Sequence, residues 1–269
     1  MIALVNSVLS QMSSFKKPQK SFIALLLSML IIVQGKANFR NMSRYCNSSE
    51  KRFNRWYHRF FDFLGFNEIL IFQQLPKHSK CIAAMDASFM KKSGKHTEGL
   101  AKFFHGAIGK AEKGLELSLI SIVDLDANMA YALDAMQTID AAKPKSENED
   151  EIARIDLYAE QAIRVAPLLI QHNIHYMAID SYYTKYKYVT PIKRSGLDAV
   201  GKLRSDANLR WLYQGEYSGR GRPKKFDGKI DFEQDLHRFK YEGMLDENIQ
   251  VYSAVVHSVC LEREIKVAM

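Results

Sequence analysis

The chain has 269 residues, of which 47% are hydrophobic, and its 38 lysines and arginines against 30 aspartates and glutamates give a formal net charge of +8. This length accommodates one large domain or two modest ones with a substantial core, and the basic excess is a mild indication of a nucleic acid or anionic partner. The only cysteines are Cys46, Cys81 and Cys260. Their number and spacing exclude a disulfide framework and a cysteine-based metal site, and favour a reducing cytoplasm.

One long apolar run covers residues 22–33, a stretch of 12 residues preceded by Lys16, Lys17 and Lys20. It is shorter than the roughly 17–25 residues that span a bilayer. The preceding lysines would suit a signal peptide, but Gln34-Gly35-Lys36 follows in place of small residues at a cleavage site. We therefore expect a buried helix, no membrane association and a cytoplasmic protein.

Residues 1–75 have a helical pattern, and we expect them to form an all-α N-terminal domain. A short helix is predicted over residues 39–46, and Asn47 to Glu50 have the spacing of a capping box that starts another helix. That second helix would place Phe53, Trp56, Tyr57 and Phe60 on one face, and Lys51, Arg52, Arg55 and Arg59 on the others. The pattern fits a DNA-binding helix-turn-helix, and equally a plain helical hairpin with a solvated basic face.

Two later stretches resemble each other: residues 82–89 and 175–183 are apolar runs that end at Asp86 and Asp180, each followed by a small residue and an aromatic. Such short apolar runs predict strands buried on both faces. If the strands are parallel neighbours, two carboxylates about 4 Å apart would repel by roughly 4 kcal/mol at an effective dielectric of 20. A divalent cation, Mg²⁺ or Mn²⁺, would convert that repulsion into binding.

Other elements follow in order around these two stretches. Strands are predicted at 82–86, 101–109 and 115–124 as an antiparallel meander with a turn at 109–114, while 130–137 suit either a strand or a short helix. An exposed charged loop is expected at 143–151, then a helix over 151–170 that Pro167 should kink or shorten. A strand ending at Asp180, a helix over 183–195 and a strand over 197–203 come next. Loops and short strands fill 204–258, and a last strand is expected within 259–269.

This order of strands and helices is that of a ribonuclease-H-like core, in which the first and fourth strands are adjacent and parallel. The predicted fold class is therefore α/β: a ribonuclease-H-like mixed sheet flanked by helices, with a β-rich insertion from near residue 204 to about 258. This catalytic domain would occupy residues 78–269, after the helix-turn-helix-like domain of residues 1–75.

Four blocks of sequence carry a resemblance to a known family. They are Met85-Asp86-Ala87-Ser88-Phe89 with the following Lys91 to His96, Ile179 to Lys185, Gly201 to Leu209, and Tyr217 to Phe226. Their order resembles that of the DDE transposases of bacterial insertion sequences, in the branch with a strand-rich insertion. The resemblance implies Mg²⁺ or Mn²⁺ held by catalytic Asp86 and Asp180, and cleavage and strand transfer of double-stranded DNA at transposon ends and target. The in-line attack on the phosphodiester would come from water or a 3′-hydroxyl, and a homodimer is implied as well.

The family's third catalytic residue is a glutamate in a Tyr-x-x-Arg-x-x-x-Glu pattern, and this sequence departs from it. Tyr217 and Arg220 have the first half of the spacing, but Lys224 stands at the last position. The sequence therefore resembles a C-terminally truncated transposase, and we expect little or no strand transfer. The alternatives are a non-catalytic DNA-binding remnant that occupies transposon ends, and a metal nuclease of the same fold completed by a local acid such as Glu98 or Glu112.

Several basic residues are candidate DNA contacts. Arg220-Gly221-Arg222-Pro223 resembles the core of an AT-hook that would enter a narrow minor groove, although a basic loop that touches only phosphates is the favoured interpretation. Lys91, Lys92 and Lys95 would contact the scissile strand or form a solvated turn. Tyr182, Tyr183, Tyr186 and Tyr188 would stack on a base or, as we favour, pack on the core. The predicted DNA contacts are Arg52, Arg55, Arg59, Lys91, Lys92, Lys95, Arg204, Arg220, Arg222, Lys224 and Lys225.

Overall fold

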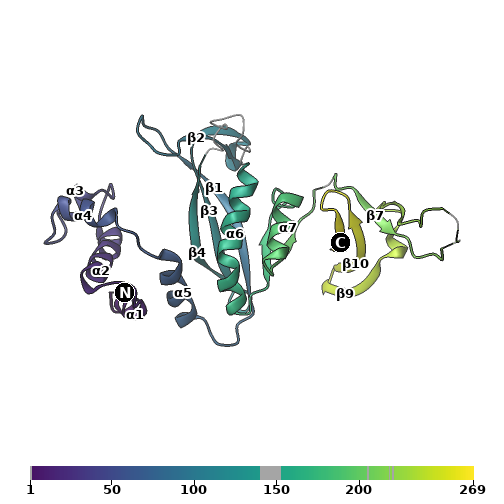
Figure 1. The fold of residues 1–269 in the computed structure, drawn as a ribbon, viewed down its shortest axis with the longest axis horizontal. Helices are drawn as coiled ribbons and strands as arrows, with labels where there is room; N and C mark the ends of the chain where they lie inside the picture. Colours follow the sequence, from purple (N-terminus) through teal and green to yellow (C-terminus); the bar gives the residue numbers. More distant parts are fainter. Residues whose placement is uncertain (1, 140–152, 205, 218, 220) are drawn as a thin grey trace. The chain divides into compact units, whose positions relative to one another are not determined.

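The computed structural model describes residues 2–139, 153–204, 206–217, 219 and 221–269 (Figure 1). It is a mixed α/β structure with two β-sheets. Contacts divide it into two compact units, residues 1–81 with 119–135 and residues 82–118 with 136–269. The loop predicted at 143–151 and the predicted DNA contact Arg220 lie outside the described residues.

Five helices precede the first strand, in agreement with the helical pattern of the N-terminal sequence. Three of them have polar N-caps: Asn38, Ser49 and Asp62 accept hydrogen bonds from Asn41, Arg52 and Gly65 backbone N–H groups respectively. Each such cap satisfies one of the otherwise unpaired donors of a first turn. The helices are α1 (Ile2–Gln11), α2 (Lys17–Ile32), α3 (Phe39–Met42), α4 (Glu50–Tyr57) and α5 (Phe63–Gln74).

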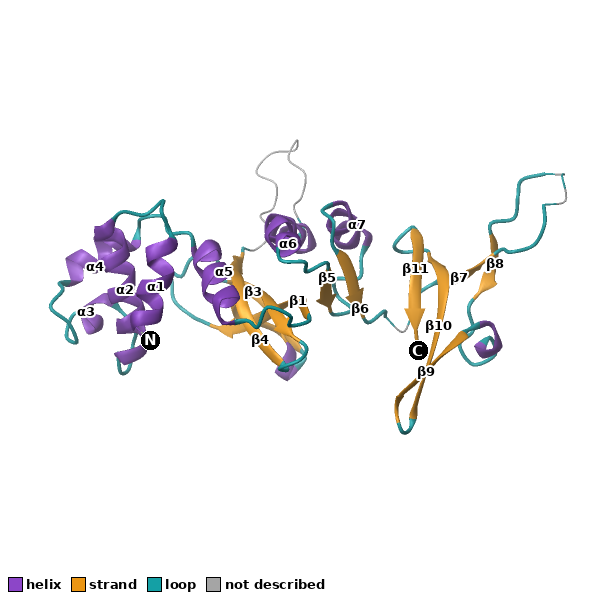
Figure 2. Ribbon diagram, turned by 90° about the horizontal axis from the view of Figure 1, so that it is seen from below, coloured by secondary structure: helices purple, strands orange, loops and turns teal. Residues whose placement is uncertain are grey.

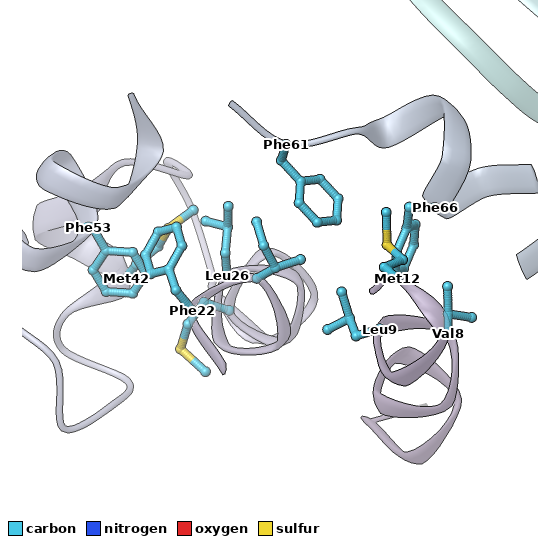
Figure 3. Close-up of a cluster of buried hydrophobic side chains, with 11 residues drawn as sticks. Val8, Leu9, Met12, Phe22, Leu26, Met42, Phe53, Phe61 and Phe66 are labelled. Carbon is cyan, nitrogen blue, oxygen red and sulfur yellow. The ribbon is translucent and has the colours of Figure 1, made fainter. Parts of the chain in front are cut away.

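The core of this helical part is an apolar cluster to which all five helices contribute (Figure 3). Phe22 and Leu26 of α2 are buried at its centre, and the ring of Phe22 lies 5.9 Å from that of Phe53. The apolar run is thus helical as expected, but it is buried on one side only: Leu30, Ile31 and Ile32 at its end are 47%, 61% and 49% exposed. Among the described residues, no helix has the length and apolar character needed to cross a bilayer.

Two details predicted for the second short helix are wrong. The N-cap is Ser49, not Asn47, so the helix begins at Glu50. It ends at Tyr57, and the expected apolar face is incomplete because Tyr57 and Phe60 are 60% and 79% exposed. Only Phe53 is fully buried, with Trp56 stacked on Phe22. Phe60 lies beyond the end of the helix, so it cannot continue the face that Phe53 and Trp56 form.

The first sheet has six strands in the order β2-β3-β1-β5-β6, with β4 also paired to β3. β1 is parallel to β5, β5 is parallel to β6, and β2 is antiparallel to β3. The prediction that the strands carrying Asp86 and Asp180 are parallel neighbours is therefore confirmed. The strands are β1 (Cys81–Lys91), β2 (Ala101–His105), β3 (Lys110–Asp124), β4 (Met129–Thr138), β5 (Tyr176–Ile179) and β6 (Asp198–Gly201).

Helices α6 (Arg154–Gln171) and α7 (Tyr186–Arg194) lie on the same face of this sheet (Figure 2). The helix α6 is attached to β3 through two side-chain hydrogen bonds, from Ser118 Oγ to Gln161 Oε1 at 2.6 Å and from Tyr158 OH to Glu116. It continues through Pro167 to Gln171, so the expected shortening at this proline is wrong. The backbone of the C-cap residue His172 still donates to Leu168 and Leu169 carbonyls, which ends the helix normally.

Several strand boundaries differ from the predictions. β1 does not stop at Asp86 but runs to Lys91. Near its end, the backbone of Met90 lies close to Gly114 of β3, and the absence of a side chain at Gly114 permits this approach. The chain turns at residues 106–109, with Gly109 in the left-handed region at φ 65°, so 110–114 are strand and not the predicted turn. The undecided segment 130–137 is strand β4.

The second sheet contains β7 (Leu209–Leu212), β8 (Phe226–Lys229), β9 (Lys240–Asp246), β10 (Ile249–Ser258) and β11 (Arg263–Ala268). Its order is β11-β10-β7-β8, and β9 also pairs with β10. Leu209, Trp211 and Val256 are central in its apolar cluster. The strand-rich character predicted from residue 204 is present, and it continues past 258 because β11 pairs antiparallel with β10.

Candidate active site

Asp86 and Asp180 are level with each other on neighbouring parallel strands. The register pairs Ala83 with Met177 and Ala84 with Ala178. Continued by two residues, this register brings Asp86 opposite Asp180, which directly follows the last residue of β5. Because neighbouring strands lie about 4.8 Å apart, the register brings the two acidic residues into one locality.

Each aspartate uses one carboxylate oxygen to fix the local backbone. The Oδ1 atom of Asp86 accepts a hydrogen bond of 2.8 Å from the Ala87 N–H, and that of Asp180 accepts one of 2.8 Å from the Tyr182 N–H. Within the described ranges, neither carboxylate has a basic partner. Both aspartates are exposed. The expected burial on both strand faces is wrong, because Ala83, Met85, Met177 and Ile179 are buried while Ala84 and Ala178 between them are only partly buried.

Tyr183 is a buried tyrosine close to the carboxylates of Asp86 and Asp180, and both contribute to its raised pKa. Its side chain is 2% exposed. Burial raises the pKa of Tyr183, and the charges of Tyr158, Asp86, Tyr188 and Asp180 raise it further. A negative charge near a phenol disfavours the phenolate, and burial does so more strongly here. This residue therefore stays neutral beside the acidic pair.

Tyr188 connects helix α7 to the two strands that carry the aspartates. Its hydroxyl has one hydrogen to donate and lies 2.9 Å from Met85 Sδ and 3.3 Å from Met177 Sδ, so the two sulfurs share this donor. Met85 directly precedes Asp86 in β1 and is buried. Burial raises the pKa of Tyr188. The tyrosine is thus a buried, neutral connection that fixes α7 under β1 and β5.

The four tyrosines predicted after the second aspartate fall into two groups. Tyr183 and Tyr188 are buried, as the packing interpretation requires, and their rings lie 5.2 Å apart. Tyr182 and Tyr186 remain 45% and 42% exposed. The ammonium of Lys185 lies 3.8 Å from the centre of the Tyr182 ring, as in a cation–π contact. Only the exposed pair is free to meet a nucleobase.

A layer of polar residues behind this cluster was missed from the sequence. Glu116 and Ser118 of β3 are buried, and their partners Tyr158 and Gln161 lie one helical turn apart on α6. Burial, followed by the hydrogen bond and charge of Glu116, raises the pKa of Tyr158. The alternation of Glu116 and Ser118 with leucines in β3 indicates buried leucines, but the structure has the reverse: Glu116 and Ser118 are buried, and Leu119 is 36% exposed. Polar residues on the buried face of a strand require partners, and here Tyr158 and Gln161 supply them.

The chemistry of the donors at the acidic pair fits a hard divalent cation. Carboxylate oxygens are the ligands that Mg²⁺ and Mn²⁺ prefer, and Mg²⁺ is commonly held by one or two carboxylates with water and phosphate oxygens. In the part of the chain that the structure describes, no group of three or more His, Cys, Asp or Glu residues is placed to hold a metal. The pair would therefore supply two protein ligands to such a cation.

The local glutamates considered as a third ligand are placed elsewhere. Glu112 bonds Lys91 Nζ at 2.8 Å and His105 Nδ1 at 3.1 Å, and these hydrogen bonds lower the pKa of its carboxyl group. Glu98 is exposed, and its backbone carbonyl accepts from Gln137. Neither joins Asp86 and Asp180 in a metal-binding group among the described residues.

The predicted DNA contacts of the second unit differ in how their charge is balanced. Lys91 is paired with Glu112, Arg204 makes two bonds of 2.9 and 3.0 Å to Asp206, and Lys224 bonds Asp227 at 2.9 Å. The remaining four, Lys92, Lys95, Arg222 and Lys225, are exposed and have no ion pair within the described ranges.

In the first unit, Arg52, Arg55 and Arg59 are exposed on or just after α4. The Arg59 guanidinium lies 4.1 Å from the centre of the Trp56 ring. The three arginines form a basic surface, but the helix that precedes α4 is one turn long and the connection between them covers residues 43–49. Whether this pair acts as a helix-turn-helix stays a prediction.

A scan of the chain against protein-family models found no match, and a search of curated proteins found no similar protein.

Proposed function

We propose that the chain is a transposase-like protein that acts on double-stranded DNA through divalent metal at Asp86 and Asp180. The observation that carries the proposal is the parallel register of β1 and β5, which brings the two aspartates level. Two exposed carboxylates without a basic partner in the described ranges are an arrangement that a cation stabilises.

The order of the first sheet supports a ribonuclease-H-like interpretation. β3, β1, β5 and β6 are successive neighbours; α6 precedes β5 in the chain, and α7 connects β5 to β6. The four sequence blocks that resemble DDE transposases fall on β1, on the segment after β5, on the segment from β6 to β7, and on the loop before β8. Fold alone does not define function, so the proposal rests on the acidic pair.

Within this proposal, Asp86 and Asp180 hold the cation through oxygen atoms that the local backbone leaves free. When bound, the metal supplies Lewis-acid activation of the attacking oxygen and stabilises the leaving oxygen. Water or a 3′-hydroxyl forms a new P–O bond in line with the P–O bond that breaks, and its proton leaves to solvent. Lys92 and Lys95 are exposed beyond the end of β1 and, in this proposal, contact the strand being cut.

A second candidate is a DNA-binding protein without strand-transfer activity. The observation that favours it is the absence of a third acidic ligand beside Asp86 and Asp180 among the described residues. Two-metal chemistry on phosphodiesters uses a clamp on both the attacking and the leaving oxygen. Two carboxylates alone would hold metal weakly and leave that clamp incomplete.

Metal binding and DNA nicking separate these candidates. The first measurement is calorimetric titration of the chain with Mn²⁺, and the second is the relaxation of supercoiled plasmid with Mg²⁺ or Mn²⁺. Asp86→Asn and Asp180→Asn should each abolish both signals. The matched control is Asp246→Asn, because Asp246 Oδ1 also accepts one backbone N–H, from Glu247 at 2.7 Å.

The metal-binding and nicking measurements distinguish the two candidate functions. Nicking that disappears in both site variants and persists in the control supports the catalytic proposal. Metal and DNA binding without any nicking supports the DNA-binding candidate. Metal affinity unchanged by both substitutions at Asp86 and Asp180 would overturn the site itself.

A further inference from the structure

The positive charge of the chain is concentrated in its helical N-terminal part. Residues 1–75 contain ten lysines and arginines against three acidic residues, a net charge of +7 out of +8 for the whole chain. The remaining 194 residues hold 28 basic and 27 acidic residues and are nearly neutral. An electrostatic attraction to a polyanion therefore originates in the helices and not in the second sheet.

Three of these basic residues surround one hollow. Lys36, Arg40 and Arg44, together with Asn38 and Asn41, line a shallow depression of about 320 Å³ on and beside α3. All three cationic side chains are exposed. None of them has an acidic partner within the described ranges, so their hydrogen-bond donors are available.

The walls of the hollow are fixed by hydrogen bonds. The Asn41 side chain donates to the carbonyl oxygens of Gln34 at 2.7 Å and of Lys36 at 3.1 Å, which holds the preceding loop against α3. Asn38 Oδ1 accepts from the Asn41 N–H at 2.8 Å. The loop also depends on Gly35, whose φ of +82° is costly for other residues.

The apolar core holds the other side of α3. Met42 is buried, and the ring of Phe39 lies 6.0 Å from Phe53 and 5.2 Å from Tyr57. Since Phe39 and Met42 point into the protein, Arg40 and Arg44 are left on the outside. The basic hollow is therefore carried on a preformed support, which reduces the ordering cost of binding.

The three acidic residues of the N-terminal part form no ion pair with Lys36, Arg40 or Arg44 within the described ranges. Asp62 caps α5 through the Gly65 N–H at 2.9 Å, and Glu50 lies in the first turn of α4, where a negative charge favours the helix dipole. The third acidic residue of this part, Glu68, lies in α5.

We propose that this hollow, lined by Lys36, Arg40 and Arg44, is a phosphate-binding site for the backbone of duplex DNA. This proposal rests on the proposed function, and it adds a DNA contact separate from Arg52, Arg55 and Arg59, which lie on or just after α4. Guanidinium groups match phosphate oxygens in a two-point geometry, and the Asn38 amide adds a neutral donor. Such contacts position a protein on DNA without reading its sequence.

The test compares two triple variants of the full chain. The first carries Lys36→Gln, Arg40→Gln and Arg44→Gln. The control carries Lys16→Gln, Lys17→Gln and Lys20→Gln, which remove the same charge from the first turn of α2 in the same part of the molecule. None of the six side chains is buried, so thermal unfolding should match the wild type in both.

Binding to a short mixed-sequence DNA duplex is measured at several salt concentrations in the presence of EDTA. Each phosphate contact contributes about 0.9 to the slope of log affinity against log salt. The first triple variant should lower that slope by about 2 to 3, and the control by less than about 1. EDTA removes any contribution of metal at Asp86 and Asp180.

Each outcome has one meaning. Equal loss of slope in both triple variants overturns the hollow and leaves the proposed function standing. Equal affinity for an RNA duplex of the same sequence overturns the choice of DNA. A wild-type chain that binds no duplex at any salt concentration overturns the hollow and the proposed function together, whereas loss of nicking in Asp86→Asn with normal binding concerns the active site alone.

Discussion

The hydroxyl of Tyr188 lies 2.9 Å from the sulfur of Met85, the residue that precedes Asp86. The same hydroxyl reaches the sulfur of Met177 on the neighbouring strand at 3.3 Å. One side chain of α7 therefore contacts both strands that lead to the acidic pair. The position of the aspartates therefore depends on the packing of α7 against β1 and β5.

Substitution at Tyr188 separates the hydroxyl from the ring. Tyr188→Phe removes a hydrogen bond to weak sulfur acceptors and should lower the free energy of unfolding by about 1 kcal/mol or less. Tyr188→Ala also removes a fully buried ring and should cost about 3–5 kcal/mol. Urea unfolding followed by circular dichroism measures both values.

The control for this pair is Tyr182→Ala, since Tyr182 is 45% exposed in the segment just before α7. Its effect on unfolding should be clearly smaller than that of Tyr188→Ala. If the two alanine variants lose the same stability, Tyr188 is not the buried connection described above.

Gly201 offers a way to disturb the acidic pair without touching it. Gly201 of β6 pairs with Ile179, the residue before Asp180, and a Cβ at this position would fall 2.7 Å from the Ile179 carbonyl oxygen. Gly201→Ala should therefore displace the end of β5. Because residues that support metal ligands typically alter affinity 10- to 100-fold, we expect Mn²⁺ affinity to fall by about tenfold or more.

The matched control is Gly106→Ala. This glycine lies in the turn after β2, its φ is not positive, and a Cβ there would meet no atom within 4 Å. Calorimetric titration with Mn²⁺ should give the wild-type affinity for Gly106→Ala. Unchanged affinity in Gly201→Ala would show that Asp180 does not depend on its strand for metal binding.

The sequence predicted the strands that carry the acidic pair because apolar runs of four or five residues are distinctive. It also predicted that these strands are parallel neighbours, from the order of strands and helices. It failed at the ends of elements: β1 continues past Asp86, where pairing with β3 outweighs the end of the apolar run. Pairing of this kind is a tertiary effect that local periodicity does not contain.

The sequence also did not predict which side chains of different helices and strands would contact each other. The bonds from Tyr188 to Met85 and from Tyr158 to Glu116 join residues 103 and 42 positions apart. Likewise, the hollow at Arg40 and Arg44 depends on which face of α3 is buried, and a four-residue helix has too little periodicity to show that. The roles of Asp86 and Asp180 stay predictions, because position alone does not establish chemistry.

Glu116 and Tyr158 are expected to be energetically coupled. Both side chains are buried and hydrogen-bonded to each other, so Tyr158→Phe leaves a buried carboxylate with one partner fewer. That loss should cost about 1–3 kcal/mol. In combination with Glu116→Leu, which removes the carboxylate, the cost of Tyr158→Phe should be smaller.

A double-mutant cycle on urea unfolding measures this coupling. A matched pair is Ser118→Ala with Gln161→Leu, because Ser118 Oγ donates to Gln161 Oε1 at 2.6 Å between the same strand and helix. Strictly additive effects of the Glu116 and Tyr158 substitutions would contradict the proposed coupling.

Glu242 should make the second sheet sensitive to acid. Its carboxylate accepts from Ser253 Oγ at 2.6 Å and from the ammonium groups of Lys240 and Lys266 at 3.0 and 3.3 Å. These hydrogen bonds, with Ser253 first, lower the pKa of Glu242 from 4.5 to about 2. Because the folded pKa is depressed, the folded chain binds fewer protons, and stability present above pH 4.5 is lost as pH falls towards 2.

Fluorescence of Trp211, the tryptophan of the second sheet, reports this transition in a Trp56→Phe background. Glu242→Gln should flatten the dependence of unfolding on pH between 4.5 and 2, since the titrating group is gone. Glu247→Gln is the control, because Glu247 lies exposed in the β9–β10 turn with no ion pair among the described residues. A pH profile that is identical in wild type and Glu242→Gln would show that the contacts with Ser253, Lys240 and Lys266 contribute nothing to stability in solution.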